Sequence, residues 1–132
     1  WHLFREAYGL RDPMPLSLGD YSSQSQANGQ LEFRADLLME GKRKMLNGRG
    51  NGLLSGAVDA LRQAFDLPLS IQDYHEHTLG QRSDSRSVAY IRCTFDDNQA
   101  AWGVGIDSDI SRASLQALLN ALTGYLQARS LL

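Results

Sequence analysis

The sequence has a single cysteine and no long hydrophobic run, and these two absences narrow the class of protein. Cys93 has no second cysteine with which to form an internal disulfide, so the disulfide framework of small secreted domains is excluded. A membrane-spanning helix needs about 18 or more consecutive apolar residues, and neither such a run nor a signal peptide is found. We therefore expect a cytoplasmic protein with no membrane partner.

A surplus of positive charge is also missing. The 132 residues include 13 basic and 15 acidic side chains, which give a formal net charge of −2. Nucleic acids attract strongly basic surfaces, so we expect no nucleic acid partner. A chain of this length is enough for one domain with a hydrophobic core of its own.

Motifs for nucleotide binding are absent as well. Gly50 and Gly52 precede an amphipathic segment, but the third glycine of a dinucleotide fingerprint would fall at Ser55. The residues before these glycines are not the continuous apolar run of a buried parallel strand. No Gly-Lys-Ser or Gly-Lys-Thr is present to form a phosphate loop. Nucleotide binding is therefore not expected.

The first half of the chain predicts three strands and a helix. Leu31–Met39 alternates apolar and polar residues, as in a strand with one exposed face. Weaker patterns predict strands over residues 16–23 and 43–47, and residues 48–52 are expected to end the third strand. The helix runs to Phe65, and its apolar stripe consists of Leu54, Ala57, Val58, Leu61 and Phe65.

The second half repeats this order. Strands are predicted over residues 70–78, 89–95 and 101–106, and a final helix has the stripe Leu115, Leu118, Leu119, Leu122 and Leu126. A glycine pair, Gly50 and Gly52 or Gly103 and Gly105, stands near the end of each third strand. The fold class is therefore α+β: two βββα repeats with pseudo-twofold symmetry, in which an antiparallel sheet has helices packed on one face.

The boundaries of the repeats follow from the same pattern. Repeat one is expected over residues 15–67 and repeat two over residues 68–132. The chain begins at Trp1 without a methionine, and Trp1, Phe4 and Tyr8 form a short helical stripe before a proline-containing stretch. We expect residues 1–14 to be the end of a preceding linker. The two helices have more leucine than one sheet needs, which favours a homodimer.

Two other features were weighed as catalytic or metal sites. His75 and His77 alternate on a strand with Asp73 on the same face, and could ligate a metal. No other cluster supplies further ligands, and a polar strand at an interface would have the same pattern, so we expect no metal. Cys93 lies among apolar residues without a histidine on its face, which favours a buried, inert thiol. No catalytic residue is assigned.

The start of the first helix is the most informative local feature. Glycines let a ligand approach the backbone, and the free N–H groups of a first helical turn attract a carboxylate or phosphate. A small anion site is therefore one interpretation of Gly50, Asn51 and Gly52. The other is a plain glycine turn that joins a strand to a helix.

Three motifs together resemble the C-terminal regulatory domain of the 2-isopropylmalate synthases. They are Gly50-Asn51-Gly52, Asp73-Tyr74-His75-Glu76-His77, and Trp102-Gly103-Val104-Gly105-Ile106 followed by Ile110-Ser111-Arg112-Ala113-Ser114-Leu115. The resemblance implies a non-catalytic domain that dimerises and binds leucine as a feedback inhibitor. The parent enzyme would condense acetyl-CoA with 2-oxoisovalerate on a metal-dependent catalytic domain. No cofactor is expected in this domain; the divalent metal and acetyl-CoA belong to the parent.

Two alternatives remain open beside leucine regulation. The related citramalate synthases have a similar domain that responds to isoleucine, and a free-standing amino-acid sensor would share the same features. Two residues depart from the family pattern: Leu53 stands where proline is common, and Ser55 where alanine is often found. Both residues affect which branched side chain the site accommodates. The position of one methyl group changes the binding free energy by only about 1–3 kcal/mol.

The resemblance and the chemistry of an amino acid together define the expected site. The carboxylate should meet the glycine turn, and the ammonium should meet backbone carbonyls or the carboxylates of Asp107 and Asp109. The side chain needs an apolar slot with small residues beside it. The expected ligand-binding residues are Gly50, Asn51, Gly52, Leu54, Ser55, Ile71, Tyr74, Thr78, Ser85, Ile106 and Asp107.

Overall fold

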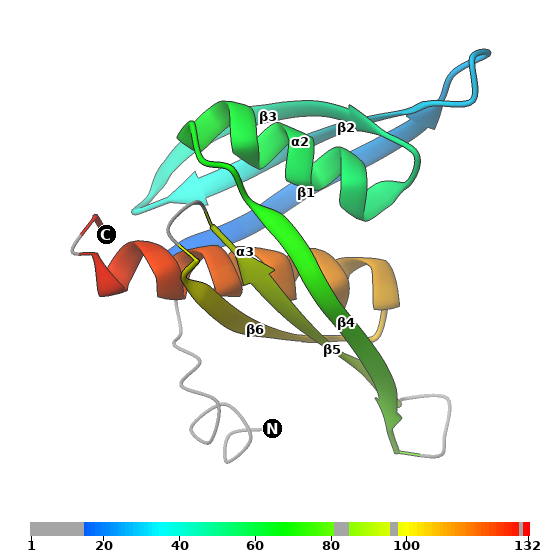
Figure 1. The fold of residues 1–132 in the computed structure, drawn as a ribbon. Helices are drawn as coiled ribbons and strands as arrows, with labels where there is room; N and C mark the ends of the chain where they lie inside the picture. The colour runs from blue at the N-terminus through cyan, green and yellow to red at the C-terminus, as the bar shows by residue number, and fades with distance from the viewer. Residues whose placement is uncertain (1–14, 81–84, 96–97, 130) are drawn as a thin grey trace.

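The computed structural model describes residues 15–80, 85–95, 98–129 and 131–132 (Figure 1). The expected linker, residues 1–14, lies outside these residues. The elements, in chain order, are β1 (Leu16–Ser25), β2 (Leu31–Met39), β3 (Lys42–Gly50), α2 (Leu53–Phe65), β4 (Ser70–Leu79), β5 (Arg86–Thr94), β6 (Ala100–Asp107) and α3 (Ile110–Ala128). No helix in this part of the chain is long and apolar enough to cross a membrane.

The predicted α+β fold with two βββα units is confirmed. In the described part of the chain, six strands form two separate antiparallel sheets, one with the order β1-β2-β3 and the other with the order β4-β5-β6, and a helix follows each sheet. Pairing is in register along the whole of β2 and β3, from Leu31 opposite Gly50 to Met39 opposite Lys42. The short turn at Glu40 and Gly41 makes this possible, because both residues have the positive φ angles of a tight hairpin.

The third strand is longer than the sequence indicated. It was expected to end at residue 47, but β3 continues to Gly50. A Cβ at Gly48 would collide with the backbone of Gly56 and Ala60 on α2, and one at Gly103 would collide with Ala117 and Ala121 on α3. These glycines therefore remain in the strands and let each helix backbone approach its own sheet closely.

The glycine pairs of the two repeats also match differently from the prediction. Gly50 lies against the backbone nitrogen of Gly56 on α2, and Gly105 lies against that of Ala117 on α3. Gly103 and Gly105 of the second repeat thus correspond in position to Gly48 and Gly50 of the first repeat, and not to Gly50 and Gly52. Because three glycines alternate in this stretch, the sequence pattern alone gave two possible alignments.

Helix α3 lies between the two sheets (Figure 1). One side faces β6, where Ala113 and Ala117 meet the strand glycines, and the other contributes Leu115 and Leu118 to a cluster with Phe33 of the first sheet. The helix is therefore buried on most sides, which explains why it is so rich in alanine and leucine. Four leucines of α3 suggested a dimer surface in the sequence, but these four side chains are buried within the chain. They are Leu115, Leu119, Leu122 and Leu126.

Helix α2 packs on the first sheet with a face of small residues. Gly56, Ala57, Ala60 and Leu61 are buried, whereas three residues of the predicted stripe, Leu54, Val58 and Phe65, are only partly buried. The prediction is correct for Ala57 and Leu61. For the other three residues it is wrong, because the buried face is rotated about the helix axis relative to the predicted stripe. The reason is again the close approach to β3, which requires small side chains at the contact.

A β-bulge changes which side chains share a face of β4. The register shifts between Ile71 and Asp73, so Ile71 pairs with Cys93 and Tyr74 pairs with Ile91. Simple alternation along residues 70–78 would place Ile71 on the face opposite to Tyr74 and Thr78, and the structure differs from that pattern here. The extra residue, Gln72, brings Ile71 onto the same face as Tyr74 and Thr78.

The two units are joined by polar contacts at the start of α3. The Arg112 guanidinium donates a hydrogen bond to the carbonyl of Gly19 on β1 at 3.1 Å, and lies 5.2 Å from the centre of the Tyr21 ring. The Tyr21 hydroxyl donates to Asp109 at 3.4 Å. Burial, and then the Asp109 carboxylate, raise the pKa of Tyr21. These contacts fix β1 against the first turn of α3.

Candidate functional site

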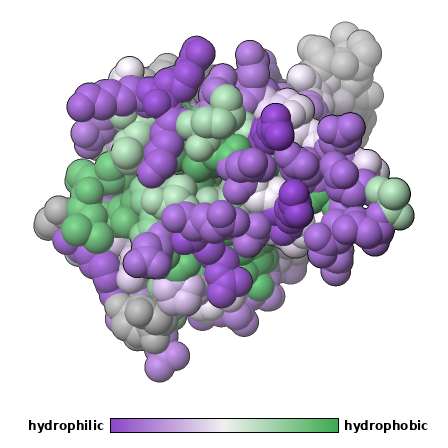
Figure 2. All heavy atoms as spheres, turned by 90° about the horizontal axis from the view of Figure 1, so that it is seen from above, coloured by the Kyte–Doolittle hydropathy of each residue, from purple (hydrophilic) through white to green (hydrophobic). Residues whose placement is uncertain are grey.

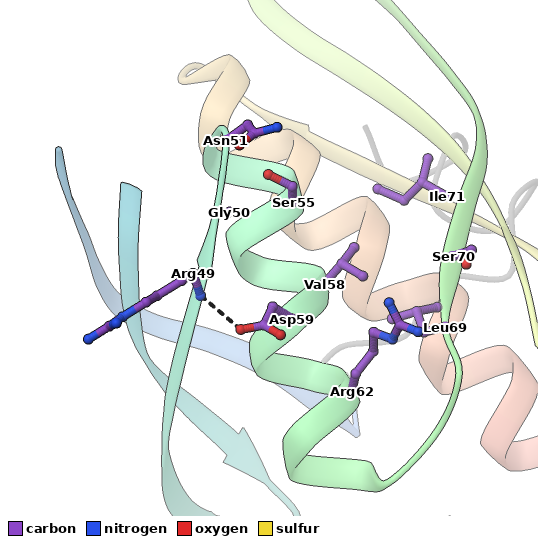
Figure 3. Close-up of a pocket in the computed structure, with 10 residues that line it drawn as sticks. All are labelled: Arg49, Gly50, Asn51, Ser55, Val58, Asp59, Arg62, Leu69, Ser70 and Ile71. Carbon is purple, nitrogen blue, oxygen red and sulfur yellow. Dashed lines mark hydrogen bonds between the residues drawn. The ribbon is translucent and has the colours of Figure 1, made fainter. Parts of the chain in front are cut away.

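A pocket of about 530 Å³ lies between α2 and the start of β4 (Figure 3). A volume of this size is within the range of small-molecule sites. Figure 3 shows Val58 of α2 and Ile71 of β4 pointing toward each other across the opening. The lining residues are Arg49, Gly50, Asn51, Ser55, Val58, Asp59, Arg62, Leu69, Ser70 and Ile71.

The N-terminus of α2 opens beside this pocket without a side-chain cap. Its N-cap is Gly52, which has no side chain, and no side chain in the described part of the chain caps this helix start. The Ser55 hydroxyl accepts a hydrogen bond from the Gly52 N–H at 2.9 Å and donates one to the Gly52 carbonyl at 3.1 Å. It therefore does not occupy the N–H groups of Leu53 and Leu54 in the first turn, which can bind another partner. At α3, by contrast, the Asp109 side chain accepts from the Ser111 N–H at 2.9 Å.

The two units differ at the corresponding place because α3 begins earlier. Gly56 on α2 corresponds to Ala117 on α3, since each meets the matching strand glycine, yet α3 already begins at Ile110. Its additional first turn brings the Ala113 carbonyl against Gly105. Within the described residues no such turn covers Gly50, so the start of α2 is open and the start of α3 is not.

Polar groups on α2 and β3 supply the charges of the pocket. Asp59 Oδ2 accepts hydrogen bonds from the Arg49 backbone N–H and from Gln63 Nε2, both at 2.9 Å. Oδ1 of the same carboxylate has no hydrogen-bond partner among the described residues. Arg62 is exposed at the edge of the pocket. The pocket thus offers an acceptor for a cation, a guanidinium for an anion and the apolar surface of Val58 and Ile71.

Some of the expected site residues meet here and others do not. Gly50, Asn51, Ser55 and Ile71 line the pocket. Gly52 and Leu54 belong to the adjoining helix start, and Tyr74 and Thr78 continue the face of β4 that carries Ile71. Ser85 lies beside Gly80, at the far end of β4.

Ile106 and Asp107 lie elsewhere in the chain. Ile106 is buried with Val88 and Val104 in a small separate cluster, on the sheet face opposite to the glycines that meet α3. Asp107 Oδ1 accepts a hydrogen bond from the Asp109 N–H at 3.0 Å. Both aspartates expected near the ligand ammonium therefore cap the start of α3.

The sequence reasoning missed several residues of the pocket wall. Val58, Asp59 and Arg62 follow Ser55 at spacings of three, four and seven residues, which is the spacing of one helix face. That pattern would have predicted the wall once the ligand-facing position of Ser55 had been proposed. Arg49, Leu69 and Ser70 also line the pocket, but they carry no local signal because the fold brings them there.

His75 and His77 lie on the face of β4 that points away from α3. The His77 ring is 5.4 Å from the Tyr90 ring, and pairing places His75 opposite Tyr90. Across residues 15–80, 85–95, 98–129 and 131–132, no group of three histidine, cysteine, aspartate or glutamate side chains is arranged to hold a metal ion.

Cys93 is expected to be chemically inert in the folded chain. It is completely buried, and burial raises the pKa of its thiol from 9.0 to about 12. The unfolded chain loses this proton from about pH 9 and the folded chain only near 12. This group therefore stabilises the fold fully below pH 9 and progressively less as the pH rises toward 12.

The reactivity of the thiol can be measured with Ellman's reagent. At pH 8 the native chain should show almost no reaction, and addition of denaturant should release one reactive thiol per chain. Rapid, complete reaction of the native chain would contradict the burial of Cys93.

The sequence of this chain is similar to one family of known proteins. A sequence model of the LeuA allosteric (dimerisation) domain matches residues 1–126. The 2-isopropylmalate synthase of Marinomonas sp. (strain MWYL1) is 47% identical over 123 residues, which are 92% of this chain and 22% of that protein. The 2-isopropylmalate synthases of Rhodospirillum rubrum and Schizosaccharomyces pombe are 38% and 32% identical, each over 92% of this chain and 22% of their own length. The chain spans about a fifth of these relatives.

Proposed function

The chain belongs to the LeuA allosteric (dimerisation) domain family, and on that basis we propose that it binds leucine in the α2–β4 pocket as a feedback inhibitor of 2-isopropylmalate synthase. The observation that carries the proposal is the uncapped N-terminus of α2, which opens beside an apolar and charged pocket. The domain itself is non-catalytic in this proposal, and the condensation belongs to the remaining part of the parent protein.

Each part of leucine has a suitable partner in this pocket. The carboxylate would accept hydrogen bonds from the first-turn amides of α2, where the helix dipole favours negative charge. The ammonium would meet Asp59 Oδ1, which has no other hydrogen-bond partner in the described part of the chain. The isobutyl group would pack on Val58 and Ile71, with Tyr74 next along the same face of β4.

The pocket needs a further wall to enclose a ligand, and we propose that a second copy of the chain supplies it. Arg49, Asn51, Ser55 and Arg62 are exposed. Figure 2 shows that apolar surface remains on one side of that view. Separately, α2 retains partly buried apolar side chains at Leu53 and Leu54. A symmetric dimer that covers the start of α2 would bury these two side chains and complete the site.

The dimer can be tested by sedimentation at micromolar concentration. The chain has a mass of 14.6 kDa, and we expect a species of about twice that mass. Leucine should shift the equilibrium further toward the dimer, because a ligand held between two copies stabilises their association. A monomer that persists with and without leucine would contradict the proposed second wall.

Titration calorimetry tests the ligand itself. Leucine, isoleucine and valine should be titrated separately into the folded chain, and we expect leucine to bind most tightly, with one site per chain. The single site follows from the additional turn that covers Gly105 in the second unit. Preferential binding of isoleucine would refute leucine as the effector and keep the regulatory class. No binding of any of the three at millimolar concentration would refute the proposed function.

A further inference from the structure

The hydroxyl of Tyr74 is held by two polar side chains from different elements. It lies 2.6 Å from Glu76 Oε2 on β4 and 2.7 Å from Ser114 Oγ on α3. Ser114 is 4% exposed, and its hydroxyl also donates to the Ile110 carbonyl at 2.9 Å. A phenol that contacts a carboxylate and a buried hydroxyl at once has its ring orientation fixed at the far end.

The direction of these hydrogen bonds follows from the chemistry of the groups. An ionised Glu76 carboxylate can only accept, so the Tyr74 hydroxyl donates to it. The single Ser114 hydroxyl proton is then shared between two acceptors, the Tyr74 phenol oxygen and the Ile110 carbonyl. Burial, followed by the bond to Glu76, raises the pKa of Tyr74. The phenol therefore stays protonated at neutral pH, and the arrangement persists.

The fixed ring stands beside the candidate pocket. Because of the bulge at Gln72, Ile71 and Tyr74 are consecutive on one face of β4, which puts them roughly 7 Å apart along the strand. Ile71 lines the pocket. Tyr74 is 36% exposed, so part of its ring is available to a ligand, although its hydroxyl is engaged.

We propose that Ser114 and Glu76 are positioning residues that hold the Tyr74 ring as a wall of the effector pocket and so set its preference among branched side chains. This inference rests on the function proposed above. A ring anchored at both the strand and the hydroxyl presents a fixed surface, and a fixed surface discriminates between isomers that differ in the position of one methyl group. A ring anchored only at the strand adapts to either isomer.

The test compares Ser114→Ala with Thr123→Val in the whole chain. Thr123 is a matched control because it is also a buried hydroxyl on α3, 3% exposed, and it donates to the carbonyl four residues earlier at 2.8 Å. Ser114→Ala should weaken leucine binding about three- to tenfold and reduce the leucine-to-isoleucine ratio. Thr123→Val should lower the melting temperature with less than about a twofold change in leucine affinity.

A double-mutant cycle separates positioning from a general loss of stability. Tyr74→Phe removes the hydroxyl and keeps the ring, so Ser114→Ala should have little further effect on leucine affinity in that background. Additive losses would overturn the inference. Equal leucine affinity and selectivity in wild type and Ser114→Ala would also overturn it. If Ser114→Ala does not fold, Tyr74→Phe alone decides, since unchanged selectivity in that variant refutes the positioning role.

Leucine binding by the wild-type chain distinguishes a failure of the positioning role from a failure of the proposed function. If wild type binds leucine and the variants bind it equally well, only the positioning role fails. If wild type binds no branched-chain amino acid, the proposed function fails, and the positioning role fails with it.

Discussion

Replacing Gly103 with alanine is expected to leave the domain unfolded at room temperature. A Cβ at this position would collide with the carbonyl of Ala117 and the backbone nitrogen of Ala121 on α3. Helix backbone cannot turn aside as a flexible side chain can, so α3 would have to move away from β6. Because α3 also packs on the first sheet, the shift would disturb both units. We expect a loss of at least about 4 kcal/mol, comparable with the whole stability of a small domain.

Gly124→Ala is the matched control for this prediction. Gly124 lies in the same helix and is exposed, and a Cβ there would meet no atom of another described element within 4 Å. Alanine is the better helix former, so this variant should gain about 0.5–1 kcal/mol. Far-ultraviolet circular dichroism during urea titration measures both variants. A Gly103→Ala variant as stable as wild type would mean that α3 does not lie as close to β6 as the structure has it.

The repeat architecture was predictable because it depends on patterns that are local in sequence. Alternation over Leu31–Met39 predicted the confirmed strand β2 with the same bounds, and the leucine spacing predicted α3. The order of elements in each half then gave the βββα unit. Whether the six strands form one sheet or two was beyond this reasoning, because strand pairing depends on contacts that are distant in sequence.

The details that failed depend on the tertiary contact between helix and sheet. Gly48 and Gly50 were assigned to a turn because glycine commonly ends strands, yet here glycine makes room for the backbone of α2. The same contact selects Gly56 and Ala60 as the buried face of that helix. No propensity scale contains this information, since it is a property of two elements and not of one.

The candidate site was predictable only in part, for a related reason. The glycine turn identified Gly50, Asn51 and Ser55, and these do line the pocket. The wall opposite depends on a bulge at Gln72, which reverses the alternation that sequence reasoning assumes. The spare leucines that suggested a dimer are largely buried in α3, so that support for self-association now rests on Leu53, Leu54 and the family.

The Gly52→Val variant is expected to fold normally and to lose its response to leucine. Gly52 has φ −158° and ψ −176°, an extended conformation that valine readily adopts. Among the residues that the structure describes, apart from the two chain neighbours of Gly52, no atom lies within 4 Å of a Cβ placed there. Valine is a poorer N-cap than glycine, and the fold should lose no more than about 1 kcal/mol. In the proposed complex, however, its two methyl groups would occupy the space through which the carboxylate reaches the first-turn amides of α2.

Thermal denaturation with and without leucine measures this loss. At a hundredfold excess over the dissociation constant, a ligand stabilises the native state by about 2.7 kcal/mol, which for a domain of this size is a shift of roughly 10 °C. Wild type and the exposed-site variant Gly124→Ala should both show the shift, and Gly52→Val should show almost none. If Gly52→Val keeps the full shift, the carboxylate of leucine does not bind at the start of α2, and the ligand must be sought elsewhere on the domain.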